Sequence, residues 1–362
     1  MKVVVTGCAG FIGAAVCDAL LKSGHSVFGV DDFNDYYKPA LKRRRVESLV
    51  GNGEFKLFEV DVSDTNAIEK VFAAVTPQRV IHLAAQAGIR RALNDPHSYG
   101  RTNLIGFLNV IEASAKLKVE HFVFASTSSV YGLNALTPFV ESHAATHPIS
   151  LYSATKVANE AIAHSYSATH GLACTGLRFF TVYGPWGRPD MAPIKFAKSI
   201  IQGHPIQIYN NGRHSRDFTY IDDIVRGVLS AVNLVAKPEK DFNPVSPNPG
   251  SSNTPWRVFN IGGENPIALM DFVAKLESAL GRKANIEFVA RQIGDMETTS
   301  ADCSALRNAT GWTPKVSLEE GLKNLAGWCE TNLDLIYSRG ERRSQSRRQL
   351  TRLMPLMKLL CR

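Results

Sequence analysis

Short runs of apolar, largely β-branched residues alternate with stretches of helical periodicity through the first half of the chain. The apolar runs have the length of buried strands, and apolar positions between them recur every three or four residues. This alternation predicts right-handed βαβ units and an α/β fold with a doubly wound parallel sheet. The expected strands are 3–6, 27–31, 55–60, 80–83, 122–126 and 173–179, and the expected helices are 11–22, 67–75, 107–117 and 152–170.

The pattern changes near residue 183. Residues 183–193 are rich in Gly, Pro and Arg, and the elements that follow are mixed in type with long connections. We expect a first domain at 1–182, to which later segments return, a smaller mixed α/β substrate-binding lobe at 183–335, and a basic, disordered tail at 336–362. Five prolines in residues 237–255 predict an irregular surface loop.

The charge of the chain is unevenly distributed. The 41 Lys and Arg and 33 Asp and Glu give a formal net charge of +8, but eight basic residues and a single acid lie beyond position 338. The rest of the chain is therefore almost neutral, whereas binding to a polyanion requires a basic stripe on a folded face. We expect no nucleic-acid partner.

The sequence does not predict a membrane segment, a disulfide or a metal site. No apolar run approaches the roughly 20 residues that a bilayer span requires, and the N-terminus enters a strand pattern at once, without a signal peptide. The six cysteines lack the spacing of a disulfide framework or a zinc site. We expect a cytoplasmic protein with no metal and no integral membrane association.

A glycine-rich turn joins the first expected strand to the first expected helix. Gly7, Gly10 and Gly13 form a GxxGxxG pattern, in which the backbone can bend and approach a pyrophosphate at the helix N-terminus. The second strand ends in Asp31, whose carboxylate suits the hydroxyls of an adenosine ribose and would repel the 2′-phosphate of NADP. The pattern predicts a Rossmann-type domain that binds NAD.

Further candidates for contact with the cofactor lie at the ends of the expected strands. Asp61 follows the third strand, where a helix-capping role stays open for its carboxylate. Residues 83–86 follow the fourth strand and are placed to border the cofactor. The predicted cofactor-binding residues are Gly7, Gly10, Phe11, Ile12, Gly13, Asp31, Asn34, Asp61, Val62, Leu83, Ala84, Ala85, Gln86, Asn103, Tyr152, Lys156 and Phe179.

Three side chains suit reversible oxidation of an alcohol. Tyr152 and Lys156 stand four residues apart in an expected helix, so both lie on one face about one turn apart. Tyrosine ionises near pH 10, and its use as a base near pH 7 requires roughly 4 kcal/mol of phenolate stabilisation, which an ammonium can help to supply. Thr127 follows the strand 122–126, and its hydroxyl can relay a proton. These are the predicted catalytic residues.

Together these motifs resemble the extended short-chain dehydrogenase/reductase family of nucleotide-sugar epimerases and dehydratases. The resemblance runs from Lys2 to about Glu330. Residues 178–192 (RFFTVYGPWGRPDMA) resemble the pattern of the UDP-glucuronate 4-epimerases within this family, and residues 216–223 (RDFTYIDD) are similar to the stretch that binds the diphosphate.

The resemblance implies a 4-epimerase that interconverts UDP-glucuronate and UDP-galacturonate. Tyr152, as phenolate, would take the proton of the sugar C4 hydroxyl while a hydride passes to tightly bound NAD, and the 4-keto sugar would turn over and take the hydride back. Arg216 and Asp295 would anchor the UDP, and other polar residues would hold the carboxylate out of line for decarboxylation. The implied substrate-binding residues are Arg90, Ser128, Ser129, Thr181, Arg188, Arg216 and Asp295.

Other functions stay open. Within the family they are a UDP-glucose/galactose 4-epimerase and a UDP-glucuronate decarboxylase, although Thr181 stands where both usually carry asparagine. A dehydratase generally needs an acidic pair where Ser128 and Ser129 stand. An NAD-sensing scaffold protein would tend to lose Tyr152 or Lys156. Arg188 has a purely structural alternative as a loop arginine. Arg216 has one as a surface ion pair with Asp217 or Asp222.

Two departures from the family pattern concern the substrate end. Arg91 stands where a tyrosine is usual, and residues 291–293 read Arg-Gln-Ile where Met-Gln-Pro is usual. The family resemblance also implies a homodimer, formed through the helices expected at 107–117 and 152–170.

Overall fold

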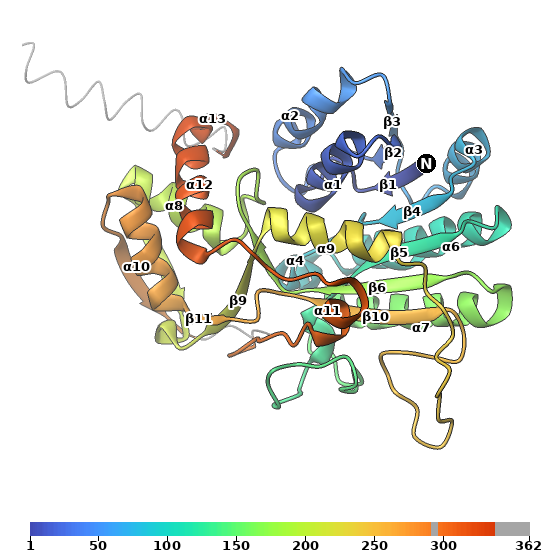
Figure 1. Cartoon of the computed structure of the whole chain (residues 1–362). Coiled ribbons are helices and arrows are strands. Elements are labelled where there is room, and N and C mark those ends of the chain that lie inside the picture. The colour runs from blue at the N-terminus through green and yellow to red at the C-terminus, as the bar shows by residue number, and fades with distance from the viewer. Residues whose placement is uncertain (291–295, 337–362) are drawn as a thin grey trace, which may run out of the picture.

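A seven-stranded parallel sheet forms the centre of the molecule (Figure 1). The computed structural model describes residues 1–290 and 296–336, except the side chains of residues 89 and 90. The strand order is β10-β6-β5-β4-β1-β2-β3. Strands β2 and β3 are added on one side of β1, and β4 and the later strands are added on the other side. The connections from β1 and β4 therefore diverge and leave the crevice where such sheets bind ligands. The strands are β1 (Lys2–Thr6), β2 (Ser26–Asp31), β3 (Phe55–Glu59), β4 (Arg79–His82), β5 (His121–Thr127), β6 (Cys174–Phe179) and β10 (Trp256–Ile261).

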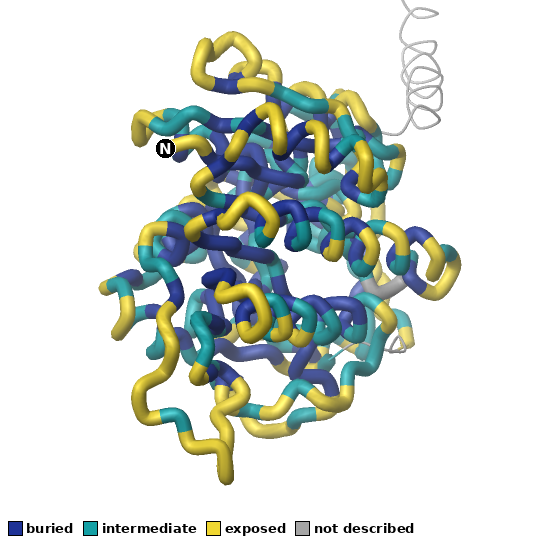
Figure 2. Tube along the Cα trace, turned by 90° about the vertical axis from the view of Figure 1, so that its right-hand side faces the viewer, coloured by how far each residue is buried: buried dark blue, intermediate teal, exposed yellow. Residues whose placement is uncertain are grey.

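The predicted doubly wound α/β fold is confirmed, and the packing of β1 shows its physical basis. Val3 and Val5 belong to one apolar core and Val4 to the other, because successive side chains of a strand point to opposite faces. Helices α1 (Phe11–Lys22), α2 (Pro39–Val50) and α9 (Ile221–Asn233) contribute to the first core. Helices α3 (Thr65–Val75), α6 (Phe107–Lys116) and α7 (Leu151–His170) contribute to the second. Figure 2 shows the sheet as a buried layer between these helices.

Helix α7 is fixed at both ends by local hydrogen bonds. Ser150 and Ser153 form a capping box, in which each side chain bonds the backbone of the other, and Gly171 ends the helix with φ of 66°. This defined start places Tyr152 in the first turn and Lys156 one turn later.

The elements that do not join the large sheet build a smaller mixed α/β lobe. Its two small sheets have the orders β11-β9-β7 and β12-β8. Phe218 of β9 and Phe272 of α10 stack in its core with ring centroids 4.2 Å apart. The elements are β7 (Thr181–Tyr183), α8 (Ala192–Gln202), β8 (Pro205–Tyr209), η3 (Asn210–Gly212), β9 (Ser215–Tyr220), β11 (Pro266–Ala268), α10 (Leu269–Leu280), β12 (Asn285–Val289), α12 (Leu318–Thr331) and α13 (Leu333–Ile336).

Several short elements lie between the longer helices and strands. They are α4 (Ile89–Asn94), α5 (Pro96–Tyr99), the π-helical η1 (Gly100–Gly106), η2 (Ser128–Tyr131) and α11 (Ser304–Thr310). Residues 237–255 form the expected exposed loop, without helix or strand apart from an isolated bridge at Ser251 (Figure 1). The predicted tail lies outside the described residues from position 337 onward. Within the described part of the chain, none of the helices has the length and apolar character needed to cross a bilayer.

Candidate active site

A cavity of about 1120 Å³ lies at the carboxyl ends of β1, β2, β4, β5 and β6. The turns that follow these strands form one wall, and residues of α8, β8 and the loop before α8 form the other. Ligands of open α/β sheets bind at this edge of the strands, next to the point where the strand order reverses. The cavity is therefore the candidate active site.

The glycine turn forms one end of the cavity, and its close packing excludes any side chain. Gly7 has φ of +70°, and a Cβ on it would lie 2.7 Å from the Ala84 amide nitrogen. A Cβ on Gly13 would lie 2.0 Å from the carbonyl oxygen of Gly7. Helix α1 also has neither an acidic residue in its first turn nor a capping side chain. Its N-terminus is thus suited to an anion such as a pyrophosphate.

Asp31 lies at the end of β2 in the cavity wall, already oriented by the backbone. Its carboxylate accepts hydrogen bonds from the amides of Ala9, at 3.0 Å, and Phe33, at 2.9 Å. Burial raises the pKa of Asp31, although these two amides and the nearby Lys42 ammonium oppose the shift. The neighbouring Asn34 also lines the cavity.

Most of the predicted cofactor-binding residues line the cavity, but two do not. The exposed Asp61 uses its carboxylate to accept the amide of Ser63 at 2.8 Å, and the cap of α3 is Asp64 instead. The buried Asn103 bonds both backbone groups of Gln86, at 2.8 and 3.0 Å. The structure thus gives Asn103 a role in positioning the loop after β4. The predicted residues that line the cavity are Gly7, Gly10, Phe11, Ile12, Gly13, Asp31, Asn34, Val62, Leu83, Ala84, Ala85, Gln86, Tyr152, Lys156 and Phe179.

Tyr152, Lys156 and Thr127 all line the cavity. The side chain of Lys156 is almost fully buried and donates a hydrogen bond to the carbonyl oxygen of Ala125 at 2.8 Å. Burial lowers the pKa of Lys156 to about 8, while the Glu160 carboxylate opposes this shift. Burial raises the pKa of Tyr152, whereas the Arg188 guanidinium and a hydrogen bond with Thr127 act to lower it. The phenol therefore depends on nearby positive charge to act as a base.

A buried ion pair lies behind Lys156 and was not predicted from the sequence. The carboxylate of Glu160 accepts two hydrogen bonds from Arg178, at 2.9 and 2.8 Å, and one from the hydroxyl of Ser126 at 2.5 Å. Together these contacts join α7 to β6 and β5. The sequence signal was the position of Glu160 four residues after Lys156, which places both on one helix face.

The predicted substrate-binding residues divide into three groups. Ser128, Ser129, Thr181 and Arg188 line the cavity. Arg216 is not among the lining residues; its guanidinium donates hydrogen bonds to the carbonyl oxygens of Ser215, Met296 and Glu297. The side chain of Arg90 and all of Asp295 lie outside the described residues.

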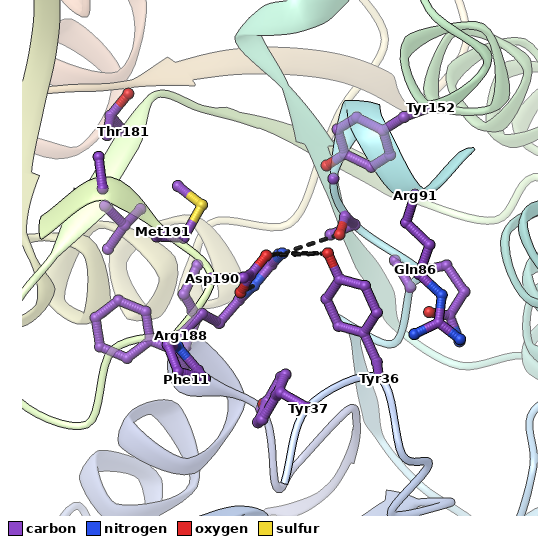
Figure 3. A pocket seen from close by; sticks show the side chains of 18 of the residues that line it. Phe11, Tyr36, Tyr37, Gln86, Arg91, Tyr152, Thr181, Arg188, Asp190 and Met191 are labelled. Carbon is purple, nitrogen blue, oxygen red and sulfur yellow. Dashed lines mark hydrogen bonds and ion pairs between the residues drawn. The ribbon is translucent and has the colours of Figure 1, made fainter. Parts of the chain in front are cut away.

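Other lining residues were not among the predicted site residues. Tyr36, Arg91 and Asp190 lie near Arg188; Tyr36 and Asp190 come from two loops and Arg91 comes from the short helix α4 (Figure 3). At the other end of the cavity, Lys195 and Lys198 are three residues apart on α8, a spacing that was visible in the sequence. Residues of β8 and β12 complete this end, namely Pro205, Ile206, Gln207, Tyr209 and Glu287.

The fold and the site define the class of protein. The chain matches the sequence profile of the NAD dependent epimerase/dehydratase family over residues 3–243. It therefore belongs to this family, and the family resemblance of the motifs is confirmed.

Individual relatives are similar along almost the whole chain. A probable UDP-glucuronate 4-epimerase of Rhizobium meliloti (strain 1021) is 43% identical over 92% of this chain and 98% of the relative. UDP-glucuronate 4-epimerase 1 of Arabidopsis thaliana is 45% identical over 91% of this chain and 76% of the relative. The crystal structure of UDP-glucuronic acid 4-epimerase from Bacillus cereus, in complex with UDP-glucuronic acid and NAD, superposes with a TM-score of 0.82 at 33% identity, covering 91% of this chain and 99% of that one.

Proposed function

We propose that this chain is a nucleotide-sugar 4-epimerase that interconverts UDP-glucuronate and UDP-galacturonate with tightly bound NAD. The observation that carries the proposal is that Tyr152, Lys156 and Thr127 lie in one cavity with the glycine turn at one end and Arg188 in the opposite wall. The B. cereus enzyme, crystallised with UDP-glucuronic acid and NAD, supports this substrate and cofactor.

The cofactor end of the cavity fits NAD. The glycines leave room for a pyrophosphate beside α1, and Asp31 stands where an adenosine ribose would lie. Bound NAD supplies reversible two-electron oxidation of an alcohol carbon and, in its oxidised form, a positive ring charge. On this proposal residues 1–182, with α9 and β10, form the domain that holds the cofactor, and the rest of residues 183–335 forms the lobe that closes the nucleotide-sugar site from the other side.

The roles of the catalytic residues follow from their positions. Tyr152, as phenolate, takes the proton of the C4 hydroxyl and returns it after the sugar has turned over. Lys156 must carry its proton to stabilise the phenolate, and Thr127 bonds both the phenol and the substrate hydroxyl. Lowering the phenol pKa from about 10 to near 7 requires roughly 4 kcal/mol of electrostatic stabilisation.

Epimerisation requires the nucleotide to stay fixed while the keto sugar rotates. The α8, β8 and β12 side of the cavity offers Lys195, Lys198 and Gln207 to the nucleotide. The sugar side offers the short hydroxyl side chains of Ser128, Ser129 and Thr181, which can exchange partners as the ring turns. A 4-keto uronate is a β-keto acid, so these groups and Arg188 must also hold its carboxylate out of line with the carbonyl π system.

The direct test is to incubate the purified protein with UDP-glucuronate and separate the products. Formation of UDP-galacturonate is expected, and the Tyr152→Phe variant should form it about 10²–10⁴-fold more slowly. The variant should retain its NAD, which shows that it is folded. Formation of UDP-xylose or a 4-keto pentose, or turnover of UDP-glucose alone, would contradict the proposal.

We also propose a homodimer that works in the cytoplasm. Four apolar side chains on or beside α4, η1, α6 and α7 are exposed: Leu93 (71%), Ile105 (48%), Leu108 (40%) and Leu151 (39%). Burial of such side chains between two subunits favours association.

The five cysteines of the described chain are free and buried, which suits a reducing compartment such as the cytoplasm. To test the dimer, light scattering should give twice the chain mass for the parent protein and the mass of one chain for the Leu108→Glu variant. A parent protein that is monomeric at micromolar concentration would contradict the dimer.

A further inference from the structure

Tyr36 extends from the loop between β2 and α2 into the cavity and reaches the loop before α8 (Figure 3). Its hydroxyl donates a hydrogen bond to the carboxylate of Asp190 at 2.9 Å. The same hydroxyl receives a longer contact from Nη2 of Arg188 at 3.3 Å. Tyr36 therefore touches both members of the Arg188–Asp190 ion pair.

The space around Tyr36 is closely fitted. Its ring lies between two guanidinium groups, with the Cζ atom of Arg91 at 4.7 Å and that of Arg188 at 5.4 Å from the ring centroid. Gly88 has φ of +127°, and a Cβ on it would lie 2.6 Å from the hydroxyl of Tyr36. The loops after β2 and β4 and the loop before α8 thus meet on this one side chain. We call Tyr36, Arg91, Arg188 and Asp190 the sugar-end cluster.

Within the cluster, Arg188 is held on one edge and open on the other. Nε and Nη2 donate to the Asp190 carboxylate at 3.1 and 2.6 Å, and Nη2 also donates to the carbonyl oxygen of Ala87 at 2.9 Å. Nη1 makes no hydrogen bond to any residue in 1–290 or 296–336 whose side chain is described. An anion in the cavity can therefore bind Nη1 while Asp190 keeps its place.

The charges of the cluster favour an anionic sugar. Arg91 and Arg188 carry two positive charges. Asp190 offsets that of Arg188, whereas Asp95, which lies outside the cluster and is 41% exposed, offsets Arg91 only weakly through a solvent-screened pair at 3.7 Å. Burial raises the pKa of Asp190, but its ion pair with Arg188 and the hydrogen bonds from Arg188 and Tyr36 outweigh burial, so the pKa is lowered and the carboxylate stays ionised. Arg188 also acts to lower the pKa of Tyr152, which places its charge within reach of the reaction.

We infer that Tyr36 is a positioning residue that holds Arg188, through Asp190, with its open Nη1 edge toward the sugar, and that Tyr36 thereby sets the preference for a C5 carboxylate over a neutral sugar. This inference rests on the proposed function. It explains why a tyrosine hydroxyl, rather than a purely apolar ring, reaches across the cavity to the ion pair.

The test measures binding without turnover, in the Tyr152→Phe background loaded with NAD. Calorimetric titrations with UDP-glucuronate, UDP-glucose and UDP give the preference for the carboxylate and the affinity for the shared nucleotide. Adding Tyr36→Phe should reduce the ratio of UDP-glucuronate to UDP-glucose affinity about tenfold, as expected for loss of a charge-assisted hydrogen bond, and leave UDP affinity unchanged. A fall in affinity for all three ligands, or an unchanged ratio, would overturn the inference.

Tyr166→Phe is the matched control, because it also removes a phenol hydroxyl bonded to a carboxylate, that of Glu112, away from the cavity. It should leave all three affinities unchanged. Asp190→Asn should also reduce the ratio of UDP-glucuronate to UDP-glucose affinity. A rise in this ratio would show that Asp190 competes with the substrate carboxylate for Arg188, and would overturn the inference. If the parent binds UDP-glucuronate no more tightly than UDP-glucose, the proposed substrate fails, whereas a normal parent with an unchanged Tyr36→Phe ratio refutes the inference alone.

Discussion

The two ends of the cavity are built in different ways. At the cofactor end, three glycines within seven residues make one turn, and at Gly7 and Gly13 backbone atoms alone leave no room for a Cβ. At the sugar end, side chains from two loops and the short helix α4 meet, and the hydrogen bond between Tyr36 and Asp190 spans 154 positions of the chain. The first arrangement follows from local sterics, and the second exists only after the two parts of the molecule have packed together.

The cofactor end should lose NAD binding completely if its backbone packing is disturbed. In Gly13→Ala, the new Cβ would lie 2.0 Å from the Gly7 carbonyl oxygen, so α1 must move away from β1. We expect complete loss of bound NAD and of activity, with about 1–3 kcal/mol lost from the free energy of unfolding. NAD released by denaturing the purified protein, together with a thermal melt, measures both effects.

Gly51→Ala is the control for this substitution. Gly51 has φ of −75°, and no atom lies within 4 Å of the position of its Cβ. The control should keep its NAD and its melting temperature. Retention of NAD by Gly13→Ala would show that the turn is less constrained than its packing indicates.

The catalytic helix depends on the buried pair of Glu160 and Arg178, which connects it to the sheet. Their side chains are 8% and 1% exposed, so Glu160→Gln leaves a buried guanidinium without its counter-charge. We expect a loss of about 3–5 kcal/mol in the free energy of unfolding, measured by chemical denaturation. Glu120→Gln breaks a pair with Arg79 in which Glu120 is 51% exposed, and should cost less than about 1 kcal/mol. Equal losses in the free energy of unfolding of the two variants would argue against a stabilising role for the buried pair.

The sugar end should fail separately from the cofactor end. Arg188→Lys keeps a positive charge but loses the planar fork that bonds Asp190 through two nitrogens. We expect UDP-glucuronate to bind about tenfold more weakly, while NAD content stays unchanged. Arg43→Lys, which alters an exposed pair with Glu59, should change neither quantity. Loss of NAD from Arg188→Lys would show that the two ends are not independent.

The smallest expected effect is a pH dependence set by Lys156. Its pKa is lowered from 10.5 to about 8, so the ammonium that Tyr152 requires is lost as pH rises through about 8, and activity should fall several-fold by pH 9. The stability effect has the opposite sign. Because the folded protein binds fewer protons than the unfolded chain between these pKa values, the stability cost of burying Lys156 is relieved as pH rises from 8 to 10.5.

Lys156→Met separates the two effects. The variant should be inactive, yet more stable than the parent at pH 7 by up to about 3 kcal/mol, and this difference should shrink toward pH 10. Denaturation at a series of pH values measures it. A constant difference across this range would contradict the lowered pKa of Lys156.

Features with a local steric or periodic cause were predictable from the sequence. The six expected strands of the first half are present within one residue at either end, because buried strands require short apolar runs. The seventh strand, β10, was not expected, because the sequence between it and β6 folds largely into another lobe. Asp61 was predicted as a cofactor contact from its place after a strand, and Asn103 was predicted beside it; neither lines the cavity, and both side chains bond backbone groups.

By itself, the sequence determined the glycine turn, the strands that build the parallel sheet and the placement of Tyr152 one helical turn from Lys156, because each element follows from the pattern of a few consecutive residues. Only the tertiary structure decided that Arg216 turns toward backbone carbonyls and that Tyr36 holds Arg188 and Asp190 at the sugar end. Those contacts depend on how distant loops pack, and a polar side chain on a loop carries no local mark of the partner it will meet.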